Sequence, residues 1–447
     1  MSSSTSKRVR NMGARVWAEG TAAVGILAGV MSTDKVSSLA MVGVALGLVS
    51  VWLVGGALVA VTVSWDYYIR SLGITISEMI AALAVLIAVV QRLMTSRRVR
   101  RLYLNASDAL ITTYGGLVVL IWATHPDFSR ATLRVILVWI VAILLYWVIS
   151  RSIFPSVRRA LVWMIWSAVL AGVVGFHQLA THNANDTFAL VFSPENSMQN
   201  LVGTEVGRVR ALFDSATEYA SALAMFLPIW ASLAWSERKF GRAKWLGAGA
   251  ILVVALLGTA TRGAWISVVV GILYVFWRLR TGRGLAFKIA ITAVLGGVTY
   301  VMTVVANQYT ALRWNATALT NSIGTRLHIY ALAWQYIAVH PLGGGPLALT
   351  VVSSGFGDTE NALLAIGVQF GIAGALLLGA FLVSTVAAAW TAEDAATVGM
   401  VGATLSLIVR SAGDPTIAVE PQILLLFVVI AGLMRRTVGG TPSDSSE

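Results

Sequence analysis

The residues of this chain best suited to chemistry are arginines at the ends of long apolar stretches. A guanidinium group matches a phosphate with a two-pronged fork of N–H donors, and a diphosphate offers two such phosphates. Several of these arginines near one surface would therefore suit a diphosphate ligand. Each one alone could instead reach the membrane interface or pair with acids such as Asp66, Asp214 and Asp414. The arginines concerned are Arg70, Arg130, Arg134, Arg208, Arg210, Arg262, Arg313, Arg326 and Arg410.

Arg262 is the strongest single candidate. It lies in residues 258–264 (GTATRGA), an abrupt polar break between two apolar stretches that leaves almost no loop. The glycines allow close approach of the backbone, and the N-terminus of the second helix is itself favourable for an anion. A tight turn whose arginine only reaches toward the interface is the alternative interpretation.

Other familiar chemistries have little support. The chain has no cysteine, which excludes disulfides, thiolate catalysis and cysteine-ligated metals. The glycine run 343–345 lacks the Lys-Ser/Thr of a nucleotide-binding loop, and no nucleophile elbow is present. No histidine has a helical His-x-x-x-His partner or an acidic partner at metal spacing, so we expect structural roles for His125, His177, His182, His328 and His340.

The elements that position these residues are predicted to be membrane helices. Of the 447 residues 57% are hydrophobic and 12% are charged, whereas about a quarter of a soluble domain is charged. Stretches such as 38–62 and 285–306 have the length of about 20 residues that a membrane-spanning helix needs. Backbone polar groups in lipid must be satisfied within the segment, so these stretches must be helical. The fold class is therefore all-α, a polytopic bundle of transmembrane helices.

The basic residues predict the topology. Clusters at 97–101, 151–159, 238–244 and 278–288 fall between alternate apolar stretches, on the side that the positive-inside rule makes cytoplasmic. The net charge of +12 then reflects topology, and no nucleic-acid partner is expected. The chain is predicted to cross the membrane about 12 times, near residues 38–62, 75–94, 104–124, 131–150, 160–180, 211–235, 244–260, 264–280, 286–306, 371–390, 396–411 and 421–434.

These spans divide the chain into five parts. Residues 1–37 form a cytoplasmic or interfacial segment, 38–306 hold spans 1–9, 307–370 form an outer-face loop, 371–434 hold spans 10–12, and 435–447 form a cytoplasmic tail. The stretch 21–32 could be a thirteenth span, but that would place the basic N-terminus outside, so we expect an interfacial helix there. No removable signal peptide is expected.

The outer loop is predicted to contain an amphipathic helix over residues 326–339. Its apolar residues Leu327, Tyr330, Ala331, Trp334 and Ile337 have the spacing of one helical face. Such a helix would lie on the outer surface of the membrane.

Three stretches resemble, in order, the O-antigen ligase/polymerase superfamily of membrane glycosyltransferases. Residues 261–265 (TRGAW) look like its Ser-Arg-Gly motif. Thr325-Arg326, Trp334 and then 340–345 (HPLGGG) look like its pattern of Arg, Trp and His-Pro-Leu-x-Gly-x-Gly. Residues 360–364 (ENALL), followed by 371–374 (GIAG), look like its His-Asn-x-x-Leu segment leading to Gly-Ile-x-Gly. The resemblance runs from about residue 208 to 390, with a weaker echo at 210–213 (RALF).

One position departs from this pattern. Glu360 stands where the ligases carry a histidine that is thought to assist the acceptor hydroxyl. A half-desolvated carboxylate has a raised proton affinity and could act as the base. It could equally pair with an outer arginine, and the departure leaves the polymerase branch open beside the ligase branch.

The resemblance implies transfer of a glycan from undecaprenyl diphosphate to an acceptor glycan or glycolipid. The reaction would take place on the outer face of a bacterial cytoplasmic membrane, without metal or cofactor. The catalytic residues would be Glu360, Arg262 and Arg326, and the substrate-binding residues would be Arg208, Arg210, His328, Gly343, Gly345 and Asn361.

Two other classes of function stay open. A transporter of an anionic solute or a lipid-linked intermediate would also collect arginines and broken helices. However, no charged residue is predicted near the middle of a span, where substrate and coupling-ion sites lie. A scaffold within a cell-envelope assembly would leave the outer arginines unexplained.

Overall fold

The computed structural model describes residues 68–69, 74–75, 105–124, 129–151, 156–181, 199–200, 207–211, 213, 215–237, 242–279, 316–346, 348–349 and 361–438. This part of the chain is helical apart from two short antiparallel strand pairs, β1 (Tyr68–Ile69) with β2 (Ile74–Thr75) and β3 (Gln199–Asn200) with β4 (Gly207–Arg208). The helices are α5 (Ala106–Thr124), α6 (Arg130–Arg151), α7 (Val157–Thr181), α9 (Ala216–Ser236), α10 (Arg242–Gly258), α11 (Arg262–Arg278), α14 (Ala316–Val339), α16 (Ala362–Ala389), α17 (Ala395–Ser411), α18 (Thr416–Val419) and α19 (Pro421–Val438).

The predicted spans can be compared with these helices. Within the described residues, 6 helices are long and apolar enough to cross a membrane, namely α5, α6, α7, α9, α16 and α19, and two shorter apolar helices correspond to α10 and α17. Each predicted span from 104–124 to 264–280, and each from 371–390 to 421–434, overlaps a helix, but α16 begins at Ala362, inside the segment 307–370 predicted as a loop. The spans near 38–62, 75–94 and 286–306 lie outside the described residues, apart from Thr75 in β2. The all-helical class is confirmed, and the count of about 12 spans stays a prediction.

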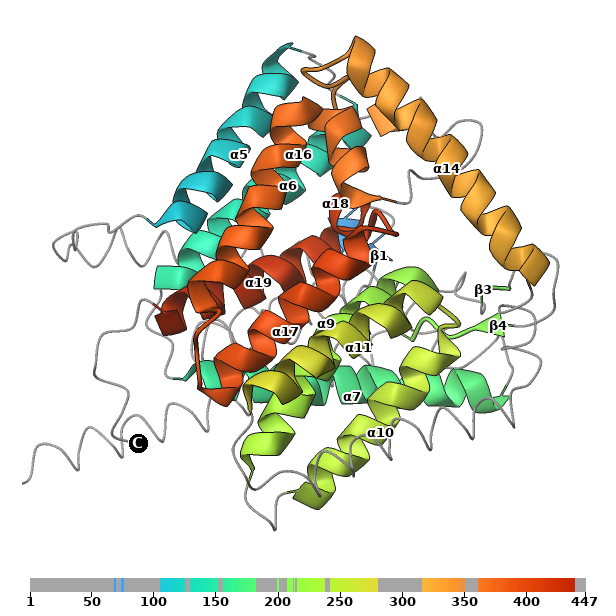
Figure 1. Ribbon diagram of the computed structural model, residues 1–447, viewed down its shortest axis with the longest axis vertical. Helices are drawn as coiled ribbons and strands as arrows, with labels where there is room; N and C mark the ends of the chain where they lie inside the picture. The colour runs from blue at the N-terminus through green and yellow to red at the C-terminus, as the bar shows by residue number, and fades with distance from the viewer. Residues whose placement is uncertain are drawn as a thin grey trace, which may run out of the picture.

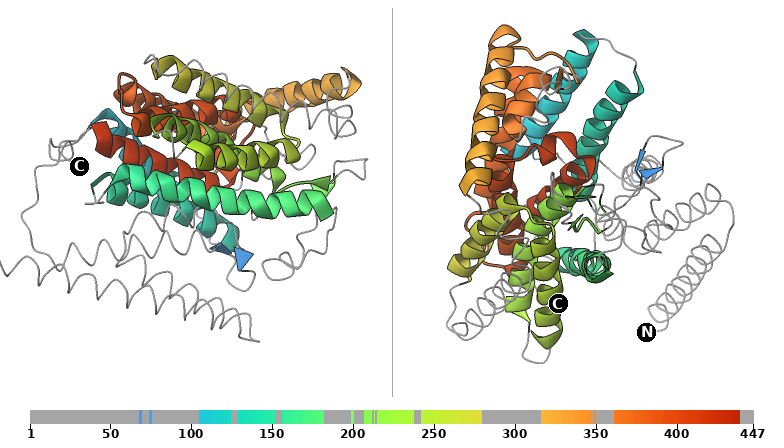
Figure 2. Two further views of the ribbon diagram at one scale, coloured as in Figure 1. Left: turned by 90° about the horizontal axis from the view of Figure 1, so that it is seen from below. Right: turned by 90° about the vertical axis from the view of Figure 1, so that its right-hand side faces the viewer.

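Helix α9 forms the centre of the bundle. It is buried over almost its whole length, and α17 and α11 pack closely against it. The close approach depends on small residues, as is usual between membrane helices. A Cβ added to Gly271 of α11 would lie 2.6 Å from the carbonyl oxygen of Gly402 in α17. In Figure 2, α9 and α17 lie between α7 on one side and α14 on the other.

The cross-helix contacts join helix ends that the charge distribution predicts to lie on the same side. At the end predicted to be cytoplasmic, Arg435 of α19 and Tyr146 of α6 both donate to Asp108 of α5, and Arg158 of α7 pairs with Glu237 after α9. At the opposite end, contacts link the starts of α9 and α11 to the end of α17. The packing thus agrees with the predicted alternation.

Helix α16 is broken in its first third, and a loop packs into the break. Gly371 has φ 74° and ψ −178°, which interrupts the helical path. The amides of Gly344 and Gly345 donate to the carbonyls of Val368 and Gln369 at 2.9 and 3.1 Å. A Cβ at Gly343 would lie 2.5 Å from the Gln369 carbonyl oxygen, so only glycine fits there. The loop anchors the C-terminal end of α14 against α16.

The predicted amphipathic helix over 326–339 is the second half of α14, which begins earlier, at Ala316. It runs along one edge of the molecule (Figure 1). The residues buried in its second half are Ile329, Ala333 and Ile337. Leu327 and Trp334 are 61% and 59% exposed, as residues of a face turned toward lipid would be.

Candidate functional site

The short segment around Arg208 is fastened to the turn between α10 and α11. The Arg208 Nε donates to the Thr259 carbonyl at 2.9 Å, and its Nη2 donates to the Thr261 hydroxyl at 2.8 Å. The next amide, that of Val209, donates to the Gly258 carbonyl at 2.9 Å. Arg208 therefore holds the turn that precedes Arg262.

The turn itself is tight, as its sequence predicts. Ala260 has a positive φ of 52°, which is unusual for a residue with a side chain, and Thr261 is the N-cap of α11. Arg262 is consequently the first residue of α11, half-buried at the helix N-terminus, ahead of the predicted span 264–280. Burial, and after it the positive charge of Arg326, lower the pKa of Arg262 below its ordinary value. The structure therefore brings the two predicted catalytic arginines close enough to repel each other.

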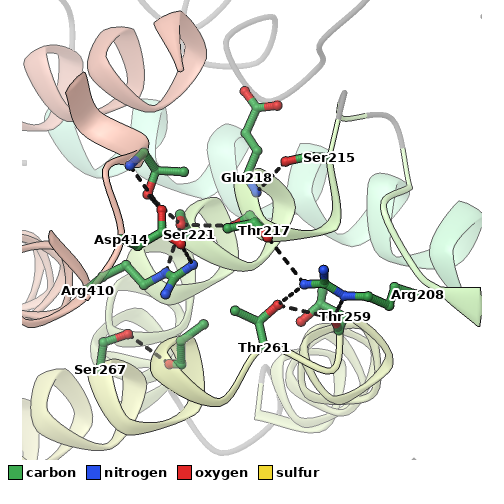
Figure 3. A network of polar contacts seen from close by, with 12 residues as sticks. Arg208, Ser215, Thr217, Glu218, Ser221, Thr259, Thr261, Ser267, Arg410 and Asp414 are labelled. Carbon is green, nitrogen blue, oxygen red and sulfur yellow. Dashed lines mark hydrogen bonds and ion pairs between the residues drawn. The ribbon is translucent and has the colours of Figure 1, made fainter. Parts of the chain in front are cut away.

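Arg410, near the end of α17, lies in a buried polar network with α9 and α18 (Figure 3). It forms an ion pair with Asp414, and its Nε donates to the Ser221 hydroxyl at 3.1 Å. Asp414 also accepts from the Thr416 amide and hydroxyl at 3.0 and 2.6 Å. Arg410 and Asp414 are 3% and 8% exposed, so this pair is largely shielded from solvent.

Asn361, a predicted substrate-binding residue, and Tyr330 of α14 meet at the turn that follows α17. The Ala412 carbonyl accepts from the Tyr330 hydroxyl of α14 at 3.3 Å and from the Asn361 Nδ2 at 3.0 Å. Arg326 lies one helical turn before Tyr330, and a Cβ added at Gly413 would be 3.7 Å from its Nη1. The start of α16, the middle of α14 and the end of α17 thus meet in one region, and the pKa effect of Arg326 on Arg262 links the start of α11 to it.

A comparison with known families bears on this region. Residues 247–379 match the model of a family described as O-antigen ligase. The match supports membership of the O-antigen ligase family. No curated protein matches the chain.

The O-antigen ligase match indicates a membrane glycosyltransferase of that type. Together with the apolar helices, it points to a bacterial inner-membrane protein. The matched segment contains Arg262, Arg326 and Asn361, but not Arg208 or Arg410. Arg262, whose pKa is lowered, and Arg326, whose charge contributes to that shift, therefore both lie in the matched segment.

The other predicted site residues lie in different surroundings. Arg210 is 5% exposed, and His328 is exposed on α14. Gly343 and Gly345 lie in the loop that packs into the break of α16, where their backbone contacts are internal. Asn361 uses its Oδ1 to cap α16 by accepting from the Leu364 amide at 3.0 Å. Glu360, the predicted base, lies outside the described residues.

Sequence reasoning did not single out the network of Arg410, Asp414, Ser221 and Thr416. The alternative of pairing with an outer acid is confirmed for Arg410 and Asp414. A signal was present, because an arginine and an aspartate four residues apart at a helix end can face each other. Ser221 could not have been found, since it comes from α9, far away in the sequence. Among the described residues, no group of three His, Asp or Glu could hold a metal ion.

Proposed function

We propose that this protein transfers a glycan from undecaprenyl diphosphate to an acceptor glycan or glycolipid on the outer face of the cytoplasmic membrane. The observation that carries the proposal is the approach of Arg262 and Arg326, from two elements far apart in sequence, at one end of the bundle. Two like charges held together raise each other's free energy, and a dianionic or trianionic ligand between them would relieve that repulsion. A diphosphate has the charge and the two groups for such a pair.

The arginines would act on the leaving group. The acceptor hydroxyl oxygen attacks the anomeric carbon, the bond from that carbon to the diphosphate oxygen breaks, and the electron pair leaves with the lipid diphosphate. Negative charge on the diphosphate grows as the bond breaks, so Arg262 and Arg326 stabilise the transition state more than the ground state. Their charge takes the place that a metal ion would have, and the reaction is proposed to be metal-independent.

The acceptor proton needs a base, and Glu360 is our candidate. It directly precedes Asn361, the N-cap of α16, whose amide lies at the turn after α17. Glu360 stands where the resembled family carries a histidine that is thought to assist the acceptor hydroxyl, and for that reason we assign it to the acceptor. Arg208 supports the reaction indirectly, because it holds the α10–α11 turn on which Arg262 depends.

The test is binding of undecaprenyl diphosphate by native mass spectrometry, together with transfer of a lipid-linked glycan in proteoliposomes. We compare wild type with Arg262→Ala, Arg326→Ala and Glu360→Gln. The matched control is Arg158→Ala, which removes an exposed arginine at the opposite end of the bundle.

The proposal expects loss of binding in the two arginine variants, and binding without transfer in Glu360→Gln. Equal binding by wild type, Arg262→Ala and Arg326→Ala would overturn it. Binding of the donor by wild type with movement across the membrane but no glycosidic product would favour the transporter alternative. The length of the product distinguishes ligase from polymerase, since a polymerase adds its repeat to another lipid-linked chain.

A further inference from the structure

The turn between α17 and α18, residues 411–415, is fixed on both flanks by one carboxylate. Arg410 before the turn forms the ion pair with Asp414. Asp414 accepts from the Thr416 amide and hydroxyl after it. Ser221 of α9 contacts both flanks, since its hydroxyl is 3.1 Å from the Arg410 Nε and 3.1 Å from the Thr416 hydroxyl. The turn is therefore anchored to the centre of the bundle.

One backbone oxygen of this turn joins two other elements to it. The Ala412 carbonyl accepts from Tyr330 of α14 and from Asn361 at the start of α16. A carbonyl oxygen has two lone pairs, so both donors can be accommodated at once. The Asn361 amide is used at both ends, because its Oδ1 caps α16. These contacts assign Asn361 a role within the protein.

Residues close to Ala412 along the chain lie near Arg326 and near the backbone next to Arg262. Gly413 lies beside the guanidinium of Arg326. Arg326 is four residues before Tyr330 on α14. On the other side, the Arg410 Nη1 is 2.7 Å from the position that a Cβ of Gly263 would occupy, next to Arg262. The turn thus contacts the surroundings of Arg326 and those of Arg262.

We propose that Tyr330 and Asn361 are positioning residues that set the separation of Arg326 from Arg262 through the Ala412 carbonyl. The inference rests on the proposed function, because the separation of the two arginines matters only if both bind the diphosphate. Two guanidinium groups clamp a diphosphate productively only at one spacing, and a displacement of about 1 Å can cost about 100-fold in rate. Stabilisation of the departing diphosphate is the step most sensitive to that spacing.

Kinetics give the first test. Tyr330→Phe removes only a hydroxyl, and Asn361→Ser keeps an oxygen that can cap α16 but loses the donor to Ala412. Each single variant is expected to lower kcat about fivefold, the worth of one hydrogen bond. The double variant, which releases α14 from the turn, is expected to lower kcat about 100-fold. The KM for the lipid-linked donor should change little, because mainly the transition state loses stabilisation.

Tyr336→Phe is the matched control. It makes the same chemical change on the same helix, at a residue whose ring packs against His340. Its kcat and KM should equal those of wild type.

A distance measurement separates positioning from direct contact with substrate. The chain has no cysteine, so paired substitutions can be labelled uniquely. Gly324→Cys on α14 and Gly247→Cys on α10 suit spin labels, since a Cβ at either position meets nothing within 4 Å. The double variant should broaden or shift the label-to-label distance distribution, while Tyr336→Phe should leave it as in wild type.

The outcomes separate this inference from the proposed function. Unchanged distances with a lowered kcat would mean that Tyr330 and Asn361 contact the substrate, and would overturn the positioning role. Unchanged distances and unchanged kcat, with Arg262→Ala inactive, would also overturn it and leave the proposed function standing. If wild type transfers no glycan, the proposed function falls, while a changed distance in the double variant would still establish the link to α14.

Discussion

Two groups of arginine lie side by side at one end of this bundle, and they differ in how their charge is satisfied. Arg410 is 3% exposed, paired with Asp414 and bonded to Ser221, so its charge is compensated inside the protein. Arg262 is half-buried, and its pKa is lowered by burial and then by the positive charge of another arginine, Arg326. The first group resembles a fixed structural support. The second holds two positive charges near each other, and an anionic ligand would reduce their repulsion.

The difference shows why the position of an arginine along the chain does not define its role. Both groups lie on the side predicted to be outer, where each arginine alone could bind an anion or pair with an acid. The two groups differ in the partners of their arginines. Arg410 pairs with Asp414, which follows its own helix, and with Ser221 of α9. An internal carboxylate makes an arginine structural, whereas two arginines held close together repel each other and would be stabilised by an anion between them.

The largest effect is expected from breaking the compensated pair. Asp414→Asn keeps the size of the side chain but leaves the buried charge of Arg410 without its carboxylate. Removal of one partner of a buried ion pair costs about 3–5 kcal/mol of stability. Thermal unfolding in detergent micelles measures this as a marked fall in Tm. An unchanged Tm would mean that the Arg410 charge has adequate compensation without Asp414, and the contrast between the two groups would disappear.

The second effect should appear in activity and not in stability. Arg262→Ala removes a charge that is expected to act on the departing diphosphate, so transfer should fall about 100- to 1,000-fold. Since the variant also removes repulsion from Arg326, its Tm should equal or slightly exceed that of wild type. Transfer assays in proteoliposomes, paired with thermal unfolding of the same preparation, check both. A variant that loses Tm as Asp414→Asn does would place Arg262 in the structural group.

Much of the fold follows from the sequence, because helix length and charge alternation are local properties. The described helices match the predicted spans from α5 to α11 and from α16 to α19, and the polar break at 258–264 is the tight turn that its composition predicts. The proximity of Arg262 and Arg326 was expected only through a family pattern. The structure supports it through the effect of one charge on the other.

The remaining features depend on contacts between distant segments. Gly343 and Gly345 stay predicted substrate-binding residues. The amides of Gly344 and Gly345 fit the break in α16 at Gly371, which no local pattern indicates. The Ala412 carbonyl has no side-chain signature at all, although it joins Tyr330 and Asn361. Backbone acceptors and helix breaks of this kind become visible only when the tertiary structure is known.

A smaller effect is expected at the edge of the compensated network. Ser221→Ala removes the hydroxyl that accepts from the Arg410 Nε and lies against Thr416, but it leaves the Asp414 carboxylate in place. The loss of one buried hydrogen-bond partner costs about 1–3 kcal/mol. Tm should therefore fall by less than in Asp414→Asn. A drop as large as that of Asp414→Asn would show that Ser221, and not the ion pair, compensates the Arg410 charge.

The smallest effect is expected where an ion pair is exposed, at the other end of the bundle. Arg158 donates to Glu237 at 3.0 Å, but its side chain is 53% exposed, so water already solvates both charges. Exposed pairs contribute about 0–1 kcal/mol. Arg158→Ala should leave both Tm and transfer close to wild type, and 0.5 M salt, which screens exposed charges, should change the wild-type Tm about as little. A large fall in transfer would mean that an arginine remote from Arg262 matters as much as Arg262 does. The pair Arg262 and Arg326 would then not account for the activity.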